Sequence, residues 1–301
     1  MVKFKHDNTD DNIPLAIIAI LLTVLALSLG DALVKLMSST FVIWQIFVLR
    51  SVLILPVLLL LARATGARKL PLGVGWIVLR SVMLIGMWVL YYLSLSHLTL
   101  SAAAAAYNTL PIFIAMLSAL ISGERVGGIG WVAVVMGFAG VLLILRPDAE
   151  DFNFYTILPV GSAILCACAM TITRLKCRDQ HPIILSLHLN IGFIIVGSLV
   201  SVLLLEMPKD LRHGFLFAAW TPMGHAEWQA IVLLALALLV GSIGAAIAYQ
   251  KGPSAMIGTL NFSYVGFAAI WGFVFLGEMP DIISTLGMVM IIAAGVLSVR
   301  H

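Results

Sequence analysis

The sequence contains very little charge for its length. Of its 301 residues, 10% are charged and 62% are hydrophobic, whereas a soluble domain has about 25% charged and about 45–50% apolar residues. Polar groups could not cover so much apolar surface in water, so lipid must surround most of the chain. The net charge of +3 does not indicate nucleic-acid binding, because the basic residues lie between hydrophobic runs and form no stripe.

Cysteine is also scarce. Cys166 and Cys168 lie within one apolar run and Cys177 at its end. An odd count argues against a disulfide framework, and no second Cys or His pair at zinc spacing accompanies them. We interpret them as small packing residues and expect no metal and no cofactor. No P-loop and no nucleophile–base set is found, so we expect no catalytic residues.

Long apolar runs fill most of the chain. A spanning helix needs about 20 apolar residues, and ten runs meet or approach this length: 13–36, 40–62, 74–95, 101–121, 128–146, 155–175, 183–205, 228–249, 254–276 and 281–299. We predict an all-α integral membrane protein with ten transmembrane helices. The first run is too long for a signal-peptide core and should remain as the first helix. The longer connection at 206–227 is either an amphipathic piece on the outer membrane face or a plain loop.

Basic residues predict the orientation, because cytoplasmic loops carry excess Lys and Arg. With the N-terminus inside, the inner segments hold eleven of them and the outer segments hold Arg146, Lys209 and Arg212. We therefore expect both termini in the cytoplasm.

The two halves of the chain end in similar sequences. Gly-Glu occurs at 123–124 and at 277–278, an offset of 154, and Gly-Val-Leu at 140–142 and at 295–297, an offset of 155. We predict a tail at 1–12, a first repeat at 13–146, a linker at 147–154 and a second repeat at 155–299. Each repeat holds five spans, an odd number, so the repeats must be inverted, an architecture common in secondary transporters.

These features together resemble a known family over nearly the whole chain. They are the ten spans in two repeats, Arg50 in the second span, the small residues that open the fourth and ninth spans, Pro111, and Gly-Glu after both of those spans. They resemble the drug/metabolite transporter superfamily and, within it, the EamA family. The resemblance implies transport of a small metabolite across a bacterial cytoplasmic membrane without ATP hydrolysis, by a monomer or a homodimer. Amino acids and cofactor-like compounds such as S-adenosylmethionine or riboflavin are possible substrates, and the direction of transport stays open.

Ionisable side chains deep in a span are functional candidates, because they are costly there unless paired or hydrated. Arg50 lies ten residues into its run, about 15 Å deep at 1.5 Å per residue. It either holds a carboxylate or phosphate of the substrate in a central cavity or forms a structural ion pair with Asp31.

Three further ionisable residues have two interpretations each. Asp31 and Lys35 lie one helical turn apart, in the favourable acid-before-base order. They either neutralise each other, or Asp31 binds substrate or a proton, which makes protons a candidate coupling ion. Arg80 either snorkels to the inner interface or lines a cavity wall. The excess of positive charge favours an anionic or zwitterionic substrate.

Aromatic and amide side chains form a second candidate set, because they can stack on and hydrogen-bond an organic substrate. We predict substrate contacts from Trp88, Tyr91, Tyr107, Asn108, Asn261 and Tyr264. The alternative is an interfacial aromatic belt, which is the stronger interpretation for Trp76 and Tyr249. The repeat-related Glu124 and Glu278 are expected to cap the helices that follow them.

The sequence therefore predicts a secondary transporter that moves a small organic metabolite through the lipid bilayer by alternating access. The alternatives are a membrane-embedded enzyme and a lipid-handling protein without transport activity.

Overall fold

The computed structural model describes residues 12–67, 73–122, 128–145, 154–253, 256–257, 260–261, 263–279 and 281–299. Within these ranges the chain is built from helices, and no strand occurs. Six of the described helices are long and apolar enough to cross a membrane: α1 (Ile13–Met37), α2 (Ile43–Ala64), α3 (Val74–Leu95), α7 (Leu158–Lys176), α8 (Pro182–Leu205) and α10 (His225–Lys251). Most of the predicted tail and linker, together with Glu124, lies outside the described residues.

Shorter apolar helices occupy the other four predicted spans. They are α4 (Leu100–Tyr107), α5 (Leu110–Ser122), α6 (Gly128–Leu145), α12 (Ser263–Leu276) and α13 (Ile282–Val299). The prediction of one continuous helix over 101–121 is wrong, because Asn108 ends α4 and a new helix begins at Leu110. Pro111 is the second residue of α5, where the missing N–H costs nothing because a first-turn N–H has no helical partner.

The ninth predicted span has a turn at the equivalent place. Asn261 lies in a turn two residues before α12 begins. It follows Ser254 by the same seven residues that separate Asn108 from Ser101. Both spans are therefore interrupted near an asparagine, whose backbone favours turns and helix ends.

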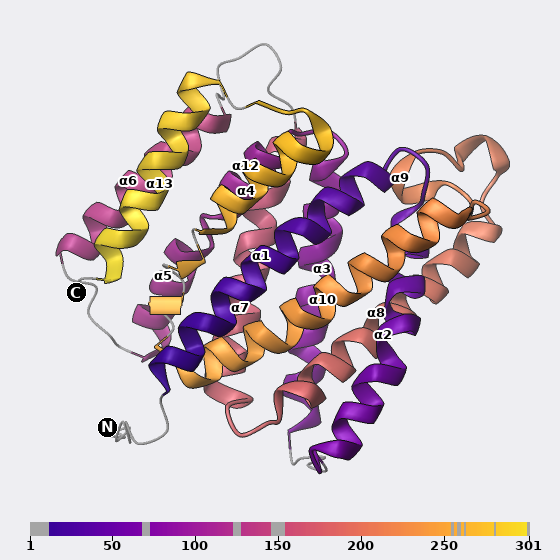
Figure 1. The fold of residues 1–301 in the computed structure, drawn as a ribbon, viewed down its shortest axis with the longest axis horizontal. Helices are drawn as coiled ribbons and strands as arrows, with labels where there is room; N and C mark the ends of the chain where they lie inside the picture. The colour runs from indigo at the N-terminus through magenta and orange to yellow at the C-terminus, as the bar shows by residue number, and fades with distance from the viewer. Residues whose placement is uncertain are drawn as a thin grey trace.

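The helices form one bundle in which α1 runs across the middle, between α12 and α10 (Figure 1). The helices α6 and α13 pack together at one edge, and α2 and α8 pack together at the other. The first N–H of the described chain, at Asn12, donates to the Lys251 carbonyl over 2.9 Å. We call this end of the bundle the N-terminal face, and the end that holds Lys35 and Glu278 the opposite face.

Two glycines bring α6 and α13 into backbone contact. A Cβ atom on Gly140 would lie 2.7 Å from the Gly287 carbonyl oxygen, and a Cβ on Gly287 would lie 2.6 Å from the Gly140 oxygen. No side chain fits at either position. Close approach of this kind is how small residues hold membrane helices together.

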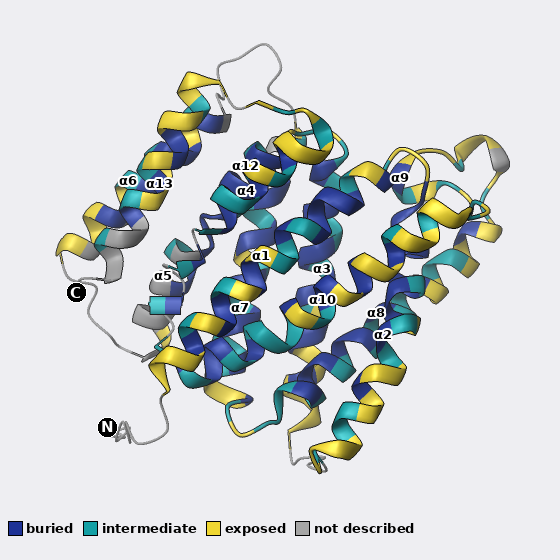
Figure 2. Cartoon of the chain, in the orientation of Figure 1, coloured by how far each residue is buried: buried dark blue, intermediate teal, exposed yellow. Residues whose placement is uncertain are grey.

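The outward faces of the helices are apolar and exposed, while the inward faces are buried (Figure 2). The exposed large apolar side chains include Leu60, Val135, Ile195, Leu236 and Phe273, each more than half accessible. A soluble monomer rarely exposes a continuous apolar surface of this extent. The distribution is that of a multi-pass protein whose outer surface contacts lipid.

The connection at 206–227 folds back onto the bundle. It contains the short turns η3 (Lys209–Leu211) and α9 (Gly214–Phe217). Trp44 Nε1 donates to the Leu216 carbonyl over 2.8 Å, and the Gln45 amide exchanges hydrogen bonds of 2.8 and 3.0 Å with the Thr221 backbone. These bonds fasten the connection to the start of α2, so it is more ordered than a plain loop, and its placement on the outer membrane face stays a prediction.

Candidate substrate cavity

A cavity of about 90 Å³ lies among the helices of both halves. Its walls come from α1, α2, α3, α4, α5, α7, α8, α10 and α12. Pockets for small organic molecules have mostly apolar walls with a few polar groups. The polar lining side chains include Thr23, Arg50, Arg80, Asn190 and Asn261.

The cavity extends toward the N-terminal face. Tyr249, near the end of α10, and Ser186, near the start of α8, both line it. On the opposite side the bundle is closed by buried groups around Tyr91 and Tyr92, which are 1% and 0% exposed.

Arg50 lines the cavity and is 1% exposed. Its guanidinium carbon lies 4.3 Å from the centroid of the Phe193 ring and 4.7 Å from that of Phe47, with Tyr92 and Trp88 at 5.7 and 5.8 Å. We call these four rings the aromatic cluster. Cation–π attraction at such distances holds the guanidinium in place while excluding water.

The hydrogen-bonding capacity of Arg50 is mostly unused within the described chain. Nη1 donates to the Tyr92 hydroxyl over 3.2 Å, whereas Nε and Nη2 have no partner there. The predicted alternative, an ion pair with Asp31, is not formed. Buried N–H donors without acceptors are costly, so this guanidinium is suited to receive an anionic group.

Arg80 also lines the cavity and is 3% exposed. Of its two interpretations, the cavity wall therefore fits the structure better than snorkelling to the interface. Its Nε donates to the Thr173 hydroxyl over 2.7 Å, and Nη1 has no partner among the described residues. The bond to α7 turns the side chain into the bundle.

Five of the six predicted aromatic and amide contacts line the cavity: Trp88, Tyr91, Tyr107, Asn261 and Tyr264. The Tyr91 and Tyr264 hydroxyls lie 3.1 Å apart, and the Tyr107 hydroxyl donates to Cys166 Sγ over 3.1 Å. The Tyr107 ring lies 5.1 Å from Tyr91 and 5.9 Å from Tyr264, centroid to centroid. Residues from both halves thus form one aromatic wall.

Asn108, the sixth, is not among the cavity-lining residues. It is 1% exposed, and its Nδ2 donates to the Ala104 carbonyl over 2.7 Å. Its described contact is with its own helix end.

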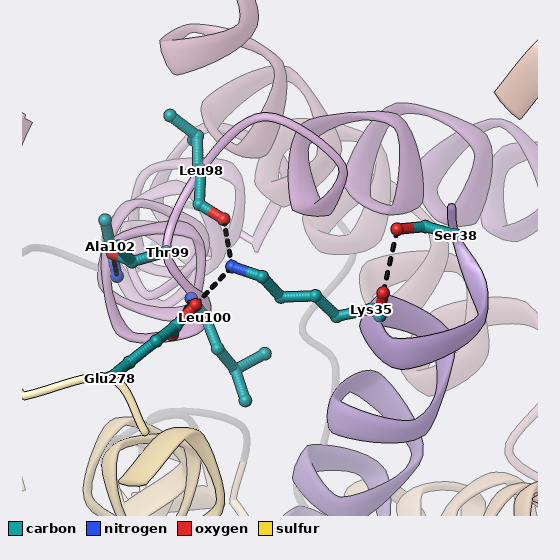
Figure 3. A network of polar contacts seen from close by, with 7 residues as sticks. All are labelled: Lys35, Ser38, Leu98, Thr99, Leu100, Ala102 and Glu278. Carbon is teal, nitrogen blue, oxygen red and sulfur yellow. Dashed lines mark hydrogen bonds and ion pairs between the residues drawn. The ribbon is translucent and has the colours of Figure 1, made fainter. Parts of the chain in front are cut away.

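Asp31 and Lys35 do not pair with each other. Lys35 Nζ lies 2.5 Å from Glu278 Oε1 and donates to the Leu98 carbonyl (Figure 3). Asp31 is 0% exposed, and both of its carboxylate oxygens lack a hydrogen-bond partner within the described chain. Tyr91, Arg50 and Tyr92 are near enough to act on it electrostatically.

Glu278 caps a helix other than the predicted one. Its Oε2 accepts from the Leu100 N–H at the start of α4 over 2.8 Å, whereas Asp281 accepts from Ser284 at the start of α13. The carboxylate thus complements the positive end of α4 and neutralises Lys35 at the same time.

Several lining residues were not predicted. The sequence does not predict Phe193 as a lining residue, because a phenylalanine in an apolar span has no polar group that would distinguish it from its neighbours. Tyr249, interpreted as a belt residue, is 3% exposed and lines the cavity. The Ser186 and Ser242 hydroxyls lie 2.6 Å apart across α8 and α10. The presence of a serine in each of these two spans is the sequence feature that could have predicted this contact. Trp76, at 44% exposed, keeps the belt interpretation.

The described part of the chain holds no group of three or more His, Cys, Asp or Glu side chains placed to bind a metal ion. The chemistry that the cavity offers is therefore that of its guanidinium, hydroxyl, amide and aromatic groups.

Known proteins resemble this chain in sequence and in fold. Residues 14–146 match the EamA-like transporter family. The pseudopaline exporter CntI of Pseudomonas aeruginosa is 26% identical over 284 residues, which cover 91% of this chain and 93% of the exporter. A riboflavin transporter of Rhizobium johnstonii is 26% identical over 200 residues, 66% of this chain and 61% of that protein.

A solved crystal structure has the same fold. It superposes with a TM-score of 0.67 at 19% identity and covers 95% of this chain and 96% of its own. The family and the named relatives are transporters of small molecules, not enzymes. This chain is a multi-pass membrane protein whose residues 14–146 match the EamA-like transporter family, and over most of its length it is similar to transporters of small molecules.

Proposed function

We propose that this protein is a secondary transporter that carries a small organic metabolite with an anionic group, amino-acid-like or cofactor-like, across the cytoplasmic membrane by alternating access. The observation that carries the proposal is Arg50, a buried guanidinium that lines the cavity with two nitrogens unpartnered in the described chain. A carboxylate or phosphate is the group that two parallel N–H donors of arginine bind best. The adjacent aromatic wall suits the organic part of the substrate.

The helix contacts support two inverted repeats of five spans. Close packing of α1 with α10 has its counterpart in α7 with α3, and packing of α3 with α8 has its counterpart in α10 with α2. In both cases the second contact is the one expected when each helix is replaced by its equivalent in the other half of the chain. Two related halves that exchange conformations expose a central site to each side in turn.

The orientation follows from the basic residues, with both termini in the cytoplasm. The N-terminal face is then cytoplasmic, so the cavity opens inward while the contacts of Lys35 and Glu278 close the outer side. Asp31 is the proposed proton-binding group, because a charged carboxylate buried without a partner is costly.

Counterflow into liposomes tests the proposal. The purified protein is reconstituted and screened with labelled amino acids, S-adenosylmethionine and riboflavin. We expect accumulation of at least one carboxylate-bearing solute, and its loss by at least tenfold in Arg50→Gln. Arg63→Gln, an exposed arginine on the same helix, is the matched control and should transport as the wild type does.

Two outcomes would contradict the proposal. Undiminished transport of the carboxylate solute by Arg50→Gln would remove Arg50 from the site. A covalently altered solute without accumulation would indicate a membrane-embedded enzyme, and flipping of labelled lipid without solute transport would indicate a lipid-handling protein.

A further inference from the structure

We infer that the cavity binds a substrate with two anionic groups, one at Arg50 and the second at Arg80, joined by an organic spacer that lies along the aromatic wall. This inference rests on the proposed function and extends it from one anionic group to two.

Arg80 has the features of a second anion-binding group. It is 97% buried, lines the same cavity as Arg50, and has an Nη1 without a partner in the described chain. No ion pair joins it to a described carboxylate. The ionisable groups that act on it are the thiols of Cys166 and Cys177, and a neutral thiol does not compensate a guanidinium. A buried cation of this kind needs an anion or water to complete its surroundings.

The two arginines approach the cavity from backbone positions at different depths of the bundle. Arg80 precedes Trp88 by eight residues on α3, which corresponds to about 12 Å along the helix. The Arg50 guanidinium lies beside Trp88, 5.8 Å from its ring. Neither guanidinium is among the charged groups that act on the other, and a carboxylate hydrogen bond spans only about 2.9 Å. We therefore take one small anion to pair with one guanidinium and to leave the other unpaired.

The wall between the two arginines accommodates a spacer. Trp88, Tyr91 and Tyr107 line the cavity beside Met87 and Leu84, so the surface is mostly apolar with hydroxyls at intervals. An organic chain or ring system would bury apolar area there, while its two acidic ends reach the two guanidinium groups.

The remaining membrane charges agree with two anionic groups. Lys35 is already neutralised by Glu278, and the buried charged side chains of the described residues are then Arg50 and Arg80 against Asp31. A dianion balances both arginines when Asp31 carries a proton, so substrate and proton can bind together without net charge in the membrane.

Binding of aliphatic diacids from glutarate to sebacate, each beside its mono-methyl ester, provides the test. The ester keeps the length of the diacid and removes one charge. Affinities are measured by titration calorimetry on the full chain in lipid nanodiscs. We expect one diacid length to bind about 10-fold to 100-fold more tightly than its ester, the range expected for an added charge-assisted contact.

Substitutions then assign the two ends. Arg80→Gln should reduce the diacid affinity to that of the ester and leave the ester unchanged, and Arg80→Lys should restore part of the preference. Arg50→Gln should weaken both ligands. Lys176→Gln removes a cation that lies over the Trp76 ring, outside the cavity, and should change neither affinity.

The outcomes separate the inference from the proposed function. Equal affinity of diacid and ester at every length, or a diacid preference that survives Arg80→Gln, overturns the inference and leaves the Arg50 site intact. Lower thermal stability of Arg80→Gln with the preference retained would show that Arg80 only joins α3 to α7. Unchanged ester binding in Arg50→Gln, or no binding of any ligand by the wild type, would contradict both proposals.

Discussion

Lys35 on α1 and Glu278 after α12 form an ion pair of 2.5 Å that ties the first helix to the far end of the chain. Both side chains are largely buried, at 17% and 18% exposed. The Glu278 carboxylate also accepts from the first N–H of α4, so three separate segments meet at this one group (Figure 3).

A double-mutant cycle should measure a coupling of about 1 kcal/mol between these residues. The variants are Lys35→Gln, Glu278→Gln and the double variant, and the free energy of unfolding is measured in detergent micelles. Glu278→Gln keeps an oxygen for the Leu100 N–H, so its loss reports mainly on the ion pair. Strictly additive effects of the two substitutions would show that the pair contributes no stability of its own.

Lys35 pairs with Glu278 and not with Asp31, the partner predicted from the sequence, and this difference shows which contacts sequence patterns can predict. The apolar runs located the helices because lipid imposes length and apolarity on every span. Spacing along α1 suggested that Lys35 pairs with Asp31, one turn away. The actual partner is 243 positions further along the chain, and no local pattern encodes which distant loop packs above a helix end.

The candidate site was predictable where residue chemistry is unusual for a membrane. Arg50 and the tyrosines stood out because polar groups are rare in spans, and they do line the cavity. Phe47 and Phe193 did not stand out, since phenylalanine is ordinary in lipid. Their role depends on the crossing of α2 and α8, which brings both rings against one guanidinium.

Cys166 offers a way to test which side the cavity opens to. It is buried and lines the cavity, whereas neither Cys168 on the same helix nor Cys177 at its end does. In a Cys168→Ser, Cys177→Ser background, a membrane-impermeant thiol reagent should label Cys166 from the cytoplasmic side of oriented vesicles. Glu278→Gln in this background should raise labelling from the outer side, because it weakens the outer closure.

The labelling result has a control and a clear contrary outcome. Cys166→Ser should abolish labelling from both sides. Faster labelling from the outer side in the parent background would show that the cavity opens outward and would reverse the proposed orientation or conformational state.

Asp31→Asn should uncouple transport from protons. The amide keeps the shape of the carboxyl group but cannot exchange a proton. We expect counterflow to continue within about threefold of wild type, and a pH gradient to lose its ability to drive accumulation. Glu227→Gln, in the first turn of α10 and outside the cavity lining, serves as the control. Continued pH-driven accumulation by Asp31→Asn would assign proton coupling elsewhere, or to no residue at all.

Gly140→Ala or Gly287→Ala should force α6 and α13 apart. In each case the new Cβ would lie within 2.7 Å of a carbonyl oxygen on the other helix. Overpacking of a tight contact costs roughly 1–3 kcal/mol, measured as the loss of unfolding free energy in micelles. Gly75→Ala has open space around its Cβ and should be nearly neutral. An equally small effect at all three positions would mean that the two helices do not pack this closely.

Phe193→Leu should weaken anion binding indirectly, through its effect on the Arg50 guanidinium. The Phe193 ring is the one nearest to the Arg50 guanidinium in the aromatic cluster, at 4.3 Å. Leucine keeps the apolar surroundings but removes the ring that positions the cation. A desolvated cation–π contact is worth about 1–2 kcal/mol, so we expect a loss of roughly 5-fold to 30-fold in affinity for the mono-methyl ester of the best-binding diacid.

The matched control is Phe217→Leu, an exposed phenylalanine on α9. It should leave the affinity unchanged, because it lies outside the cavity. If Phe193→Leu also binds with wild-type affinity, the rings pack against Arg50 without orienting it. The Tyr92 hydroxyl would then be the group that orients the guanidinium, and Tyr92→Phe, which removes that acceptor and keeps the ring, should weaken the affinity.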